Sequence, residues 1–330
     1  MTSKHHEREE ELSRRQLLRR AAAAGGLAAT GGIWAYLFYT TDPVRRRREK
    51  LYTFKDYSLT LSSGDVDLTV VHGKDEGKMA RAALETLGGI SRFVRPGERV
   101  LIKPNVGWDR QPELAANTNP LLVESVVALC LEAGAADVWV TDVSINDPYR
   151  SFARSGMEEA VRRAGGQIKY TSERDFVPTD LKGDVLKIWP VSRFYHEVDR
   201  VINMPIVKHH SLSQCSIAMK NWYGVLGGRR NRLHQRIDDS IADLAAAIRP
   251  TLTIIDATRV LKQNGPTGGS LSDVSIENTI IAGRDEVALD AYSLRFLNLS
   301  VDDIPFLGIA EKRGLGFTNW KALKTAELSV

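Results

Sequence analysis

The chain has 330 residues, 43% of them hydrophobic, which is enough to bury a large core in one domain or in two smaller ones. Its net charge of +4 is unevenly placed: residues 1–50 contain 11 Lys and Arg against 6 Asp and Glu, which leaves −1 for the other 280 residues. A domain that is neutral overall lacks the field that attracts a phosphate backbone, so we expect no nucleic-acid partner.

The N-terminus has the pattern of an export signal. Residues 1–20 form a polar leader in which Arg14 and Arg15 lie in the run SRRQLLR, which resembles the twin-arginine motif of the export route for folded proteins. An apolar stretch rich in alanine and glycine follows over residues 21–39. We therefore expect the twin-arginine translocation machinery as a partner and an extracytoplasmic location, periplasmic or on the outer face of the inner membrane. The alternative is an amphipathic helix with an accidental arginine pair.

The apolar stretch is interpreted as a signal or membrane-anchor helix. Residues 21–39 are long enough to span a bilayer, and they end in Trp34, Tyr36, Phe38 and Tyr39, aromatic residues typical of a membrane interface. No small-x-small cleavage site precedes the polar region, which favours an uncleaved anchor. The basic block from Arg45 to Arg48 argues the other way, because basic flanks favour the cytoplasmic side.

Residues 40–65 are interpreted as a basic linker and residues 66–330 as a single α/β domain. Strands are expected at 99–103, 137–141, 167–170, 185–189, 199–204, 251–255 and 278–282. Helices are expected at 120–133, 152–163, 234–248 and 286–297, the first of them capped by Asn119 and closed by Gly134. A long loop is expected after residue 204, as far as Gly228. The alternation predicts an α/β fold with a largely parallel sheet and helices on both faces, preceded by the N-terminal signal or anchor helix.

The two cysteines, Cys130 and Cys215, are far apart in the sequence and form no CxxC motif. This chain is therefore expected to hold neither an iron–sulfur cluster nor a thiolate zinc site by itself.

Polar side chains follow four of the predicted strands. In open α/β sheets ligands bind beyond the carboxyl ends of the strands, so these side chains are candidates for one site. They are Lys103, Asn105, Asp142, Lys208, His209, His210 and Asp256. Since any chain meets water at its strand ends, a purely structural role for each single position carries about equal weight.

Four more residues join the candidates. His234 is placed at a helix start and faces the sheet, and the alternative for it is a buried capping histidine. Asp290 falls on an apolar helix face and needs a cation, a metal or backbone amides as its partner. Lys220 and Asn221 lie beside a glycine-rich turn that starts at Gly224, where backbone amides could approach an anion.

The residue types suggest three roles. Anion binding is assigned to Lys103, Asn105, Lys208, Lys220 and Asn221. Acid–base work near neutral pH is assigned to His209, His210 and His234. A divalent metal, Mg or Mn, is suggested for Asp142, Asp256 and Asp290.

Several of these motifs occur together in one known family. In order they are Lys103-Pro-Asn, Asn119-Pro, the run from Asn203 to His210, Lys220-Asn with Gly224, His234, Ile255-Asp256, Gly265-Pro266 and Asp285-x-x-Ala-x-Asp290. From about residue 98 to Gly316 the chain resembles the bacterial and archaeal domain-of-unknown-function family 362. The resemblance implies an α/β domain and no settled reaction. Many members carry a ferredoxin-like cysteine segment, and its absence here argues against direct electron transfer by this chain.

Two functions from different classes follow. The first is an enzyme that acts on an anionic small molecule with acid–base or metal assistance. The second is a non-catalytic accessory or binding protein for an exported redox complex, whose partner would hold the cofactor. A solute-binding protein is a third, weaker option.

Overall fold

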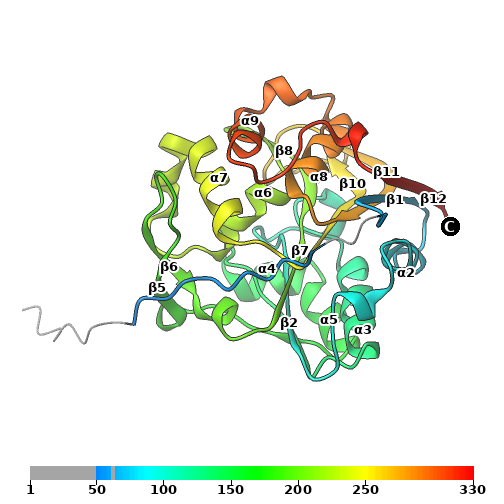
Figure 1. Ribbon diagram of the computed structural model, residues 1–330, viewed down its shortest axis with the longest axis horizontal. Helices are drawn as coiled ribbons and strands as arrows, with labels where there is room; N and C mark the ends of the chain where they lie inside the picture. The colour runs from blue at the N-terminus through cyan, green and yellow to red at the C-terminus, as the bar shows by residue number, and fades with distance from the viewer. Residues whose placement is uncertain (1–49, 61–63) are drawn as a thin grey trace, which may run out of the picture. The chain divides into compact units, whose positions relative to one another are not determined.

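A mostly parallel sheet forms the centre of the computed structural model, which describes residues 50–60 and 64–330 (Figure 1). Across the sheet the strand order is β12 (Thr325–Ser329), β1 (Leu68–His72), β11 (Val274–Gly283), β10 (Leu252–Leu261), β7 (Arg200–Met204), β2 (Arg99–Pro104), β3 (Asp137–Val140), β4 (Gln167–Ile168). On this path only β11 runs antiparallel to its neighbours. Two further strands extend the sheet from β10: β8 (Ile206–His210), parallel to β10, and β9 (Gln214–Ser216), antiparallel to β8.

Helices cover both faces of this sheet. On one face lie α2 (Glu76–Thr86), α3 (Pro120–Glu132) and α5 (Met157–Arg163), and on the other α6 (Ala218–Asn221), α7 (Ile237–Ala247), α8 (Glu286–Ser293) and α9 (Pro305–Lys312) (Figure 1). Successive residues of a strand point to opposite faces, and β2 shows this directly. Leu101 packs into the core under α6–α9, whereas Ile102 packs into the core under α2, α3 and α5.

The expected start of the helix after the first strand is confirmed. Pro120 is the first residue of α3, and the side chain of Asn119 accepts a hydrogen bond from the backbone N–H of Leu121. Gly134 follows the helix with a φ of 89°, a conformation that costs glycine little.

Other elements differ from the sequence-based expectation. The helix expected at 152–163 is two helices, α4 (Pro148–Arg154) and α5, because Gly156 between them adopts a left-handed φ of 73°. The segment expected as a long loop after residue 204 contains β8, β9 and α6. The strand expected at 251–255 continues to Leu261 as β10. The strand expected at 185–189 is β6 (Ile188–Ser192), which pairs with β5 (Phe176–Asp180) in a separate two-stranded sheet.

Residues 51–330 form one compact unit by their contacts. It includes part of the segment interpreted as a linker: Tyr52 forms a bridge with Thr179, and Tyr57 is buried. The twin-arginine motif and the apolar stretch at 21–39 lie outside the described residues. Within residues 50–60 and 64–330, no helix is both long enough and apolar enough to cross a membrane.

Candidate functional site

A cavity of about 430 Å³ opens where the ends of β2 and β3 meet β8, α6 and the turn of 3₁₀ helix at Arg230–Arg236. Eight of the eleven candidate residues line it, namely Lys103, Asn105, Asp142, Lys208, His210, Lys220, Asn221 and His234. The cavity is therefore the place where the sequence-derived candidates converge.

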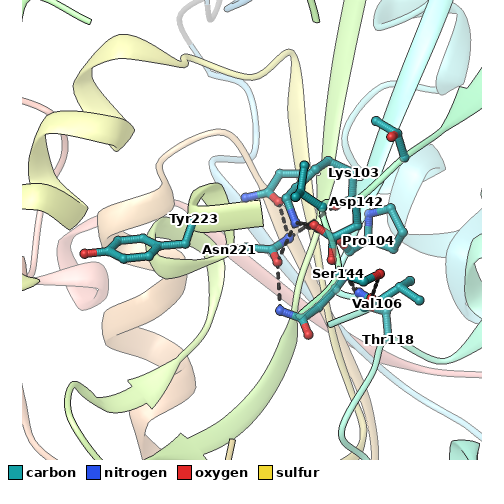
Figure 2. A network of polar contacts seen from close by, with 12 residues as sticks. Lys103, Pro104, Val106, Thr118, Asp142, Ser144, Asn221 and Tyr223 are labelled. Atoms are coloured by element: carbon teal, nitrogen blue, oxygen red, sulfur yellow. Dashed lines mark hydrogen bonds and ion pairs between the residues drawn. The ribbon is translucent and has the colours of Figure 1, made fainter. Parts of the chain in front are cut away.

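Lys103 and Asp142 line this cavity. Figure 2 shows the network of polar contacts to which they belong. Lys103 Nζ donates hydrogen bonds to Asp142 Oδ1 at 2.7 Å, to the carbonyl oxygen of Pro104 at 2.8 Å and to Asn221 Oδ1 at 3.0 Å. The second carboxylate oxygen of Asp142 accepts from the backbone N–H of Val106 at 2.7 Å. Both charged groups are thus neutralised by each other and held by further polar contacts.

Two asparagines connect this ion pair to the next lysine. Asn221 Oδ1 also accepts from Asn105 Nδ2 at 3.0 Å, and Asn105 Oδ1 accepts from Lys208 Nζ at 2.8 Å. On its other side Asn221 Nδ2 donates to Asn203 Oδ1 at 2.8 Å. Because each of these asparagine amides both donates and accepts a hydrogen bond, the network fixes which way each amide group points. Asn105 and Asn221 therefore connect Lys103 to Lys208 through hydrogen bonds.

Lys208 comes from β8 and is 2% exposed. Its ammonium group donates to Asn105 and to the carbonyl oxygen of Ala116 at 2.6 Å, which leaves one of its three protons uncommitted. Burial, helped by the charges of Lys220 and Lys103, lowers the pKa of Lys208 to about 7 against the opposing effect of Asp142.

Lys220 comes from α6 and is 6% exposed. Its Nζ lies 3.7 Å from the centroid of the Tyr223 ring, a cation–π contact. In the described part of the chain no oxygen accepts a hydrogen bond from this group. Burial, and next the charge of Arg230, lower the pKa of Lys220 to about 7.

Asp290 explains how the short helix α6 is held. From α8 its carboxylate accepts hydrogen bonds from the backbone N–H groups of Ala218, at 2.7 Å, and Met219, at 3.1 Å. The sequence left a cation, a metal or backbone amides open as the partner of Asp290, and in the structure the partners are backbone amides. Burial raises the pKa of Asp290 well above its ordinary value. Asp290 does not line the cavity itself. It holds the start of α6, and α6 carries Lys220 and Asn221, which do line the cavity.

Two histidines line the cavity wall. His210 Nδ1 accepts from the backbone N–H groups of Leu212 and Ser213, at 3.2 and 3.3 Å, so the proton of the neutral ring is on Nε2. Burial, reinforced by Lys220 and Lys208, lowers the pKa of His210 to about 2. His234 stacks on Tyr223 with ring centroids 5.8 Å apart, and its pKa is also lowered, mainly by burial.

Arg230 lines the same cavity and was missed in the sequence-based assignment. Its guanidinium donates to four backbone carbonyl oxygens, those of Tyr223, Leu226, Val143 and Ser144. These contacts leave its positive charge without a carboxylate partner among the described residues. The only signal in the sequence was its position two residues after Gly228, the last glycine of the glycine-rich turn.

Glu286 was also missed. It is buried behind α6, where its carboxylate accepts from Asn203, Trp222 and Thr253 at 2.6, 2.8 and 2.9 Å. Burial raises its pKa to about 7. Asn203, which donates to Glu286, also accepts a hydrogen bond from Asn221, so Glu286 is connected to the asparagine network.

Three candidates lie away from the cavity lining: His209, Asp256 and Asp290. His209 Nδ1 accepts from the backbone N–H of Gly265 at 3.1 Å. Asp256 lies inside β10 and accepts from the backbone N–H groups of Asn119 and Thr258, so it supports the start of α3.

The three aspartates suggested as metal ligands are consequently not brought together. Asp142 binds Lys103, Asp256 supports α3 and Asp290 supports α6. Over residues 50–60 and 64–330, no three or more His, Cys, Asp or Glu side chains are grouped so that they could hold a metal ion.

The charges around the cavity are unbalanced. Four cationic side chains line it, Lys103, Lys208, Lys220 and Arg230, against the single carboxylate of Asp142, which is already paired with Lys103. Apolar groups complete the lining, among them Trp108, Ile145 and Leu212. Such a site can bind an anionic group beside an apolar one and exclude a cation.

Comparison with known proteins adds a family and relatives. A family model described as "Domain of unknown function (DUF362)" matches residues 100–295. A thylakoid-associated protein of Synechocystis sp. is 28% identical over 254 residues, which cover 72% of this chain and 75% of that protein.

Two solved structures show weaker similarity. The lactate racemase apoprotein from Thermoanaerobacterium thermosaccharolyticum aligns with a TM-score of 0.40 and 13% identity, over 75% of this chain and 61% of that chain. A structural-genomics protein from Thermotoga maritima aligns with a TM-score of 0.36 and 10% identity, over 72% of this chain and 60% of that chain. The matched regions thus span only about three fifths of either solved chain.

Proposed function

The chain belongs to the family described as domain of unknown function 362, and because that description names no activity, we propose one from the cavity: it binds a small anionic molecule and acts on it by acid–base chemistry. One observation carries this proposal. Lys208, Lys220 and Arg230 line the cavity, and its single carboxylate, that of Asp142, is already paired with Lys103. A buried cation is costly unless a charge of opposite sign joins it, so an anionic ligand would stabilise all three.

The histidines supply the acid–base groups in this proposal. His210, neutral and protonated on Nε2, would donate a hydrogen bond to an oxygen of the ligand. His234, whose pKa is lowered, would remain largely neutral near pH 7 and could accept a proton. The two asparagines, which hydrogen-bond Lys103 and Lys208, would hold these two lysines in place.

Anion binding can be tested by titration calorimetry of the full-length protein with inorganic phosphate and with oxalate. Lys208→Met and Lys220→Met should each weaken binding about tenfold or more, because a charge-assisted hydrogen bond contributes roughly 1.5–3 kcal/mol. Lys78→Met is the matched control, since Lys78 is exposed on α2.

The affinity should also fall as the pH rises above about 7, because the lysines lose their protons there. If neither anion binds, or if both lysine variants bind as the parent does and lose only thermal stability, the lysines are structural. The accessory or binding role within an exported redox complex is then favoured.

The proposal places this domain outside the cytoplasm and at a membrane. Arg14, Arg15 and the apolar residues 21–39 support export and anchoring, and the name of the Synechocystis relative supports association with a membrane. Cell fractionation tests this. Arg14→Lys combined with Arg15→Lys should leave the protein in the cytoplasm, whereas Arg46→Lys with Arg47→Lys should not. Export of the first variant at the normal level would show that the motif is not an address.

A further inference from the structure

The three buried lysines of the cavity differ in what their ammonium groups contact. Lys103 Nζ has three hydrogen-bond acceptors, Lys208 Nζ has two, and Lys220 Nζ has none among residues 50–60 and 64–330. Lys220 instead lies over the face of Tyr223, 3.7 Å from the ring centroid. Once deprotonated, Lys220 is thus the lysine whose lone pair and protons are least committed to the fold.

The surroundings of Lys220 favour its neutral form. Burial and the nearby guanidinium of Arg230 lower its pKa to about 7, so the unprotonated amine is a much larger fraction at neutral pH than for an exposed lysine. A lysine that is desolvated in a pocket beside another cation is a good nucleophile toward carbonyl carbon. An exposed lysine, with a pKa near 10.4, has only a very small neutral fraction at the same pH.

We propose that Lys220 forms an imine with the carbonyl group of a small anionic aldehyde or ketone, such as a 2-oxo acid, in the cavity. The inference rests on the proposed function, since Lys208 and the field of Arg230 would hold the carboxylate of the same ligand. The new Nζ–C bond forms as the carbonyl π bond opens, and the carbonyl oxygen leaves as water with both amine protons. The imine then takes one proton from solvent and becomes an iminium ion, so no further reactant is needed.

The charge of the iminium explains why the ligand should be anionic. An iminium made from a neutral ketone would add a permanent cation beside Lys208 and Arg230. The carboxylate of a 2-oxo acid cancels that charge. His210 fits the same step, because its Nε2–H can donate a hydrogen bond to the carbonyl oxygen as negative charge develops there. Being neutral, His210 does this without adding a fourth unpaired cation.

Reductive trapping tests the imine. The full-length protein is incubated with pyruvate and sodium cyanoborohydride near pH 7, and peptide mass spectrometry locates and quantifies the carboxyethyl groups. Lys220 should be modified at least about tenfold faster than the exposed Lys78, because a far larger fraction of it is neutral. Its labelling rate should level off above about pH 7, and oxalate should slow it. In the Lys220→Arg variant, the total number of carboxyethyl groups per protein should fall to the number that the exposed lysines alone acquire.

The outcomes separate this inference from the proposed function. If oxalate binds but Lys220 reacts no faster than Lys78, the imine is overturned and anion binding stands. If Lys220 is modified rapidly but oxalate does not slow it, the amine is reactive and the carboxylate class of ligand is overturned. If oxalate does not bind and Lys220 is unreactive, both proposals fail.

Discussion

Lys103 and Asp142 form a buried ion pair that joins the ends of two neighbouring strands, with Nζ 2.7 Å from Oδ1 and side chains that are 0% and 3% exposed. Lys103 belongs to β2, and Asp142 follows β3, which pairs in parallel with β2 up to Ile102 and Val140. Because the Asp142 carboxylate is paired with Lys103, it is not free to pair with Lys208, Lys220 or Arg230, which line the same cavity.

Removing one member of this pair should be strongly destabilising. Lys103→Met leaves the buried carboxylate of Asp142 without its cation, which costs about 3–5 kcal/mol for buried ion pairs. We expect this loss in the free energy of unfolding measured with urea. Lys103→Met combined with Asp142→Leu should recover part of it, because neither charge then remains buried. A single variant as stable as the parent would show that the pair does not hold the strand ends.

The stability of the protein should depend on pH through Lys220. Its pKa is about 7 in the folded chain and near 10.4 in the unfolded chain, so between these values the unfolded chain binds more protons. Stability therefore rises with pH across this window, and below about pH 7 the cost of the buried ammonium is largest, about 1.4 kcal/mol for each unit of pKa difference.

Lys220→Met removes this cost. The variant should have a higher melting temperature than the parent at about pH 6, and the difference should shrink toward about pH 10. Lys78→Met on the surface of α2 should show no such trend. A Lys220→Met protein that melts below the parent at about pH 6 would mean that the lysine has a stabilising partner in the fold.

Asp290 should matter for both stability and the cavity. Asp290→Ala leaves the N–H groups of Ala218 and Met219 without an acceptor in the interior, which costs roughly 1–3 kcal/mol for each buried group. Because these residues begin α6, the position of Lys220 should also be disturbed. Urea unfolding and anion affinity measure the two effects.

The matched variant is Asp290→Asn, which keeps one oxygen as an acceptor. It should lose less stability than Asp290→Ala and bind anions more nearly as the parent does. Equal losses in the two variants would show that the acceptor oxygen is not what holds α6.

Much of the site could be predicted because the carboxyl ends of parallel strands meet at one edge of the sheet. Lys103 lies near the end of β2 and Asn105 follows it, while Asp142 follows the neighbouring strand β3, so their side chains converge. Asp256 does not join them, because β10 does not end there: it continues to Leu261. Aspartate is rare inside strands, and here its carboxylate is satisfied by the backbone at the start of α3.

Which of His209 and His210 lines the cavity could not be decided from the sequence, for a different reason. In a strand, alternate side chains point to opposite sides, so Lys208 and His210 line the cavity and His209 between them does not. This distinction requires that residues 206–210 be recognised as a strand. The sequence suggested a loop there, because the buried polar residues Lys208 and His210 obscure the apolar pattern of a strand. Arg230 could not be assigned from the sequence either, because its hydrogen bonds all go to backbone carbonyl oxygens. Two of these oxygens belong to Val143 and Ser144, which are distant in the chain.

Gly224 in the glycine-rich turn has a role that its backbone position explains. A Cβ atom at this residue would lie 1.9 Å from Asp142 Oδ1 and 2.5 Å from Lys103 Nζ, distances at which atoms cannot remain. The sequence suggested that the turn lets backbone amides approach an anion. In the structure Gly224 leaves the space that the ion pair occupies, and its carbonyl oxygen accepts from the N–H of Val143 at 2.8 Å.

Gly224→Ala should therefore displace the Lys103–Asp142 pair and lower the free energy of unfolding by at least about 2 kcal/mol, as overpacking of a tight interior does. Anion affinity should fall with it, because Asn221 is hydrogen-bonded to the same pair and connects it to Asn105 and Lys208.

Gly308→Ala is the matched control. Gly308 lies within α9 with open space around its missing Cβ, so alanine there should leave stability unchanged or raise it by about 0.5–1 kcal/mol. Thermal unfolding and oxalate calorimetry on both variants measure the two effects. A Gly224→Ala protein that unfolds and binds as the parent does would mean that the ion pair can move without consequence for the cavity.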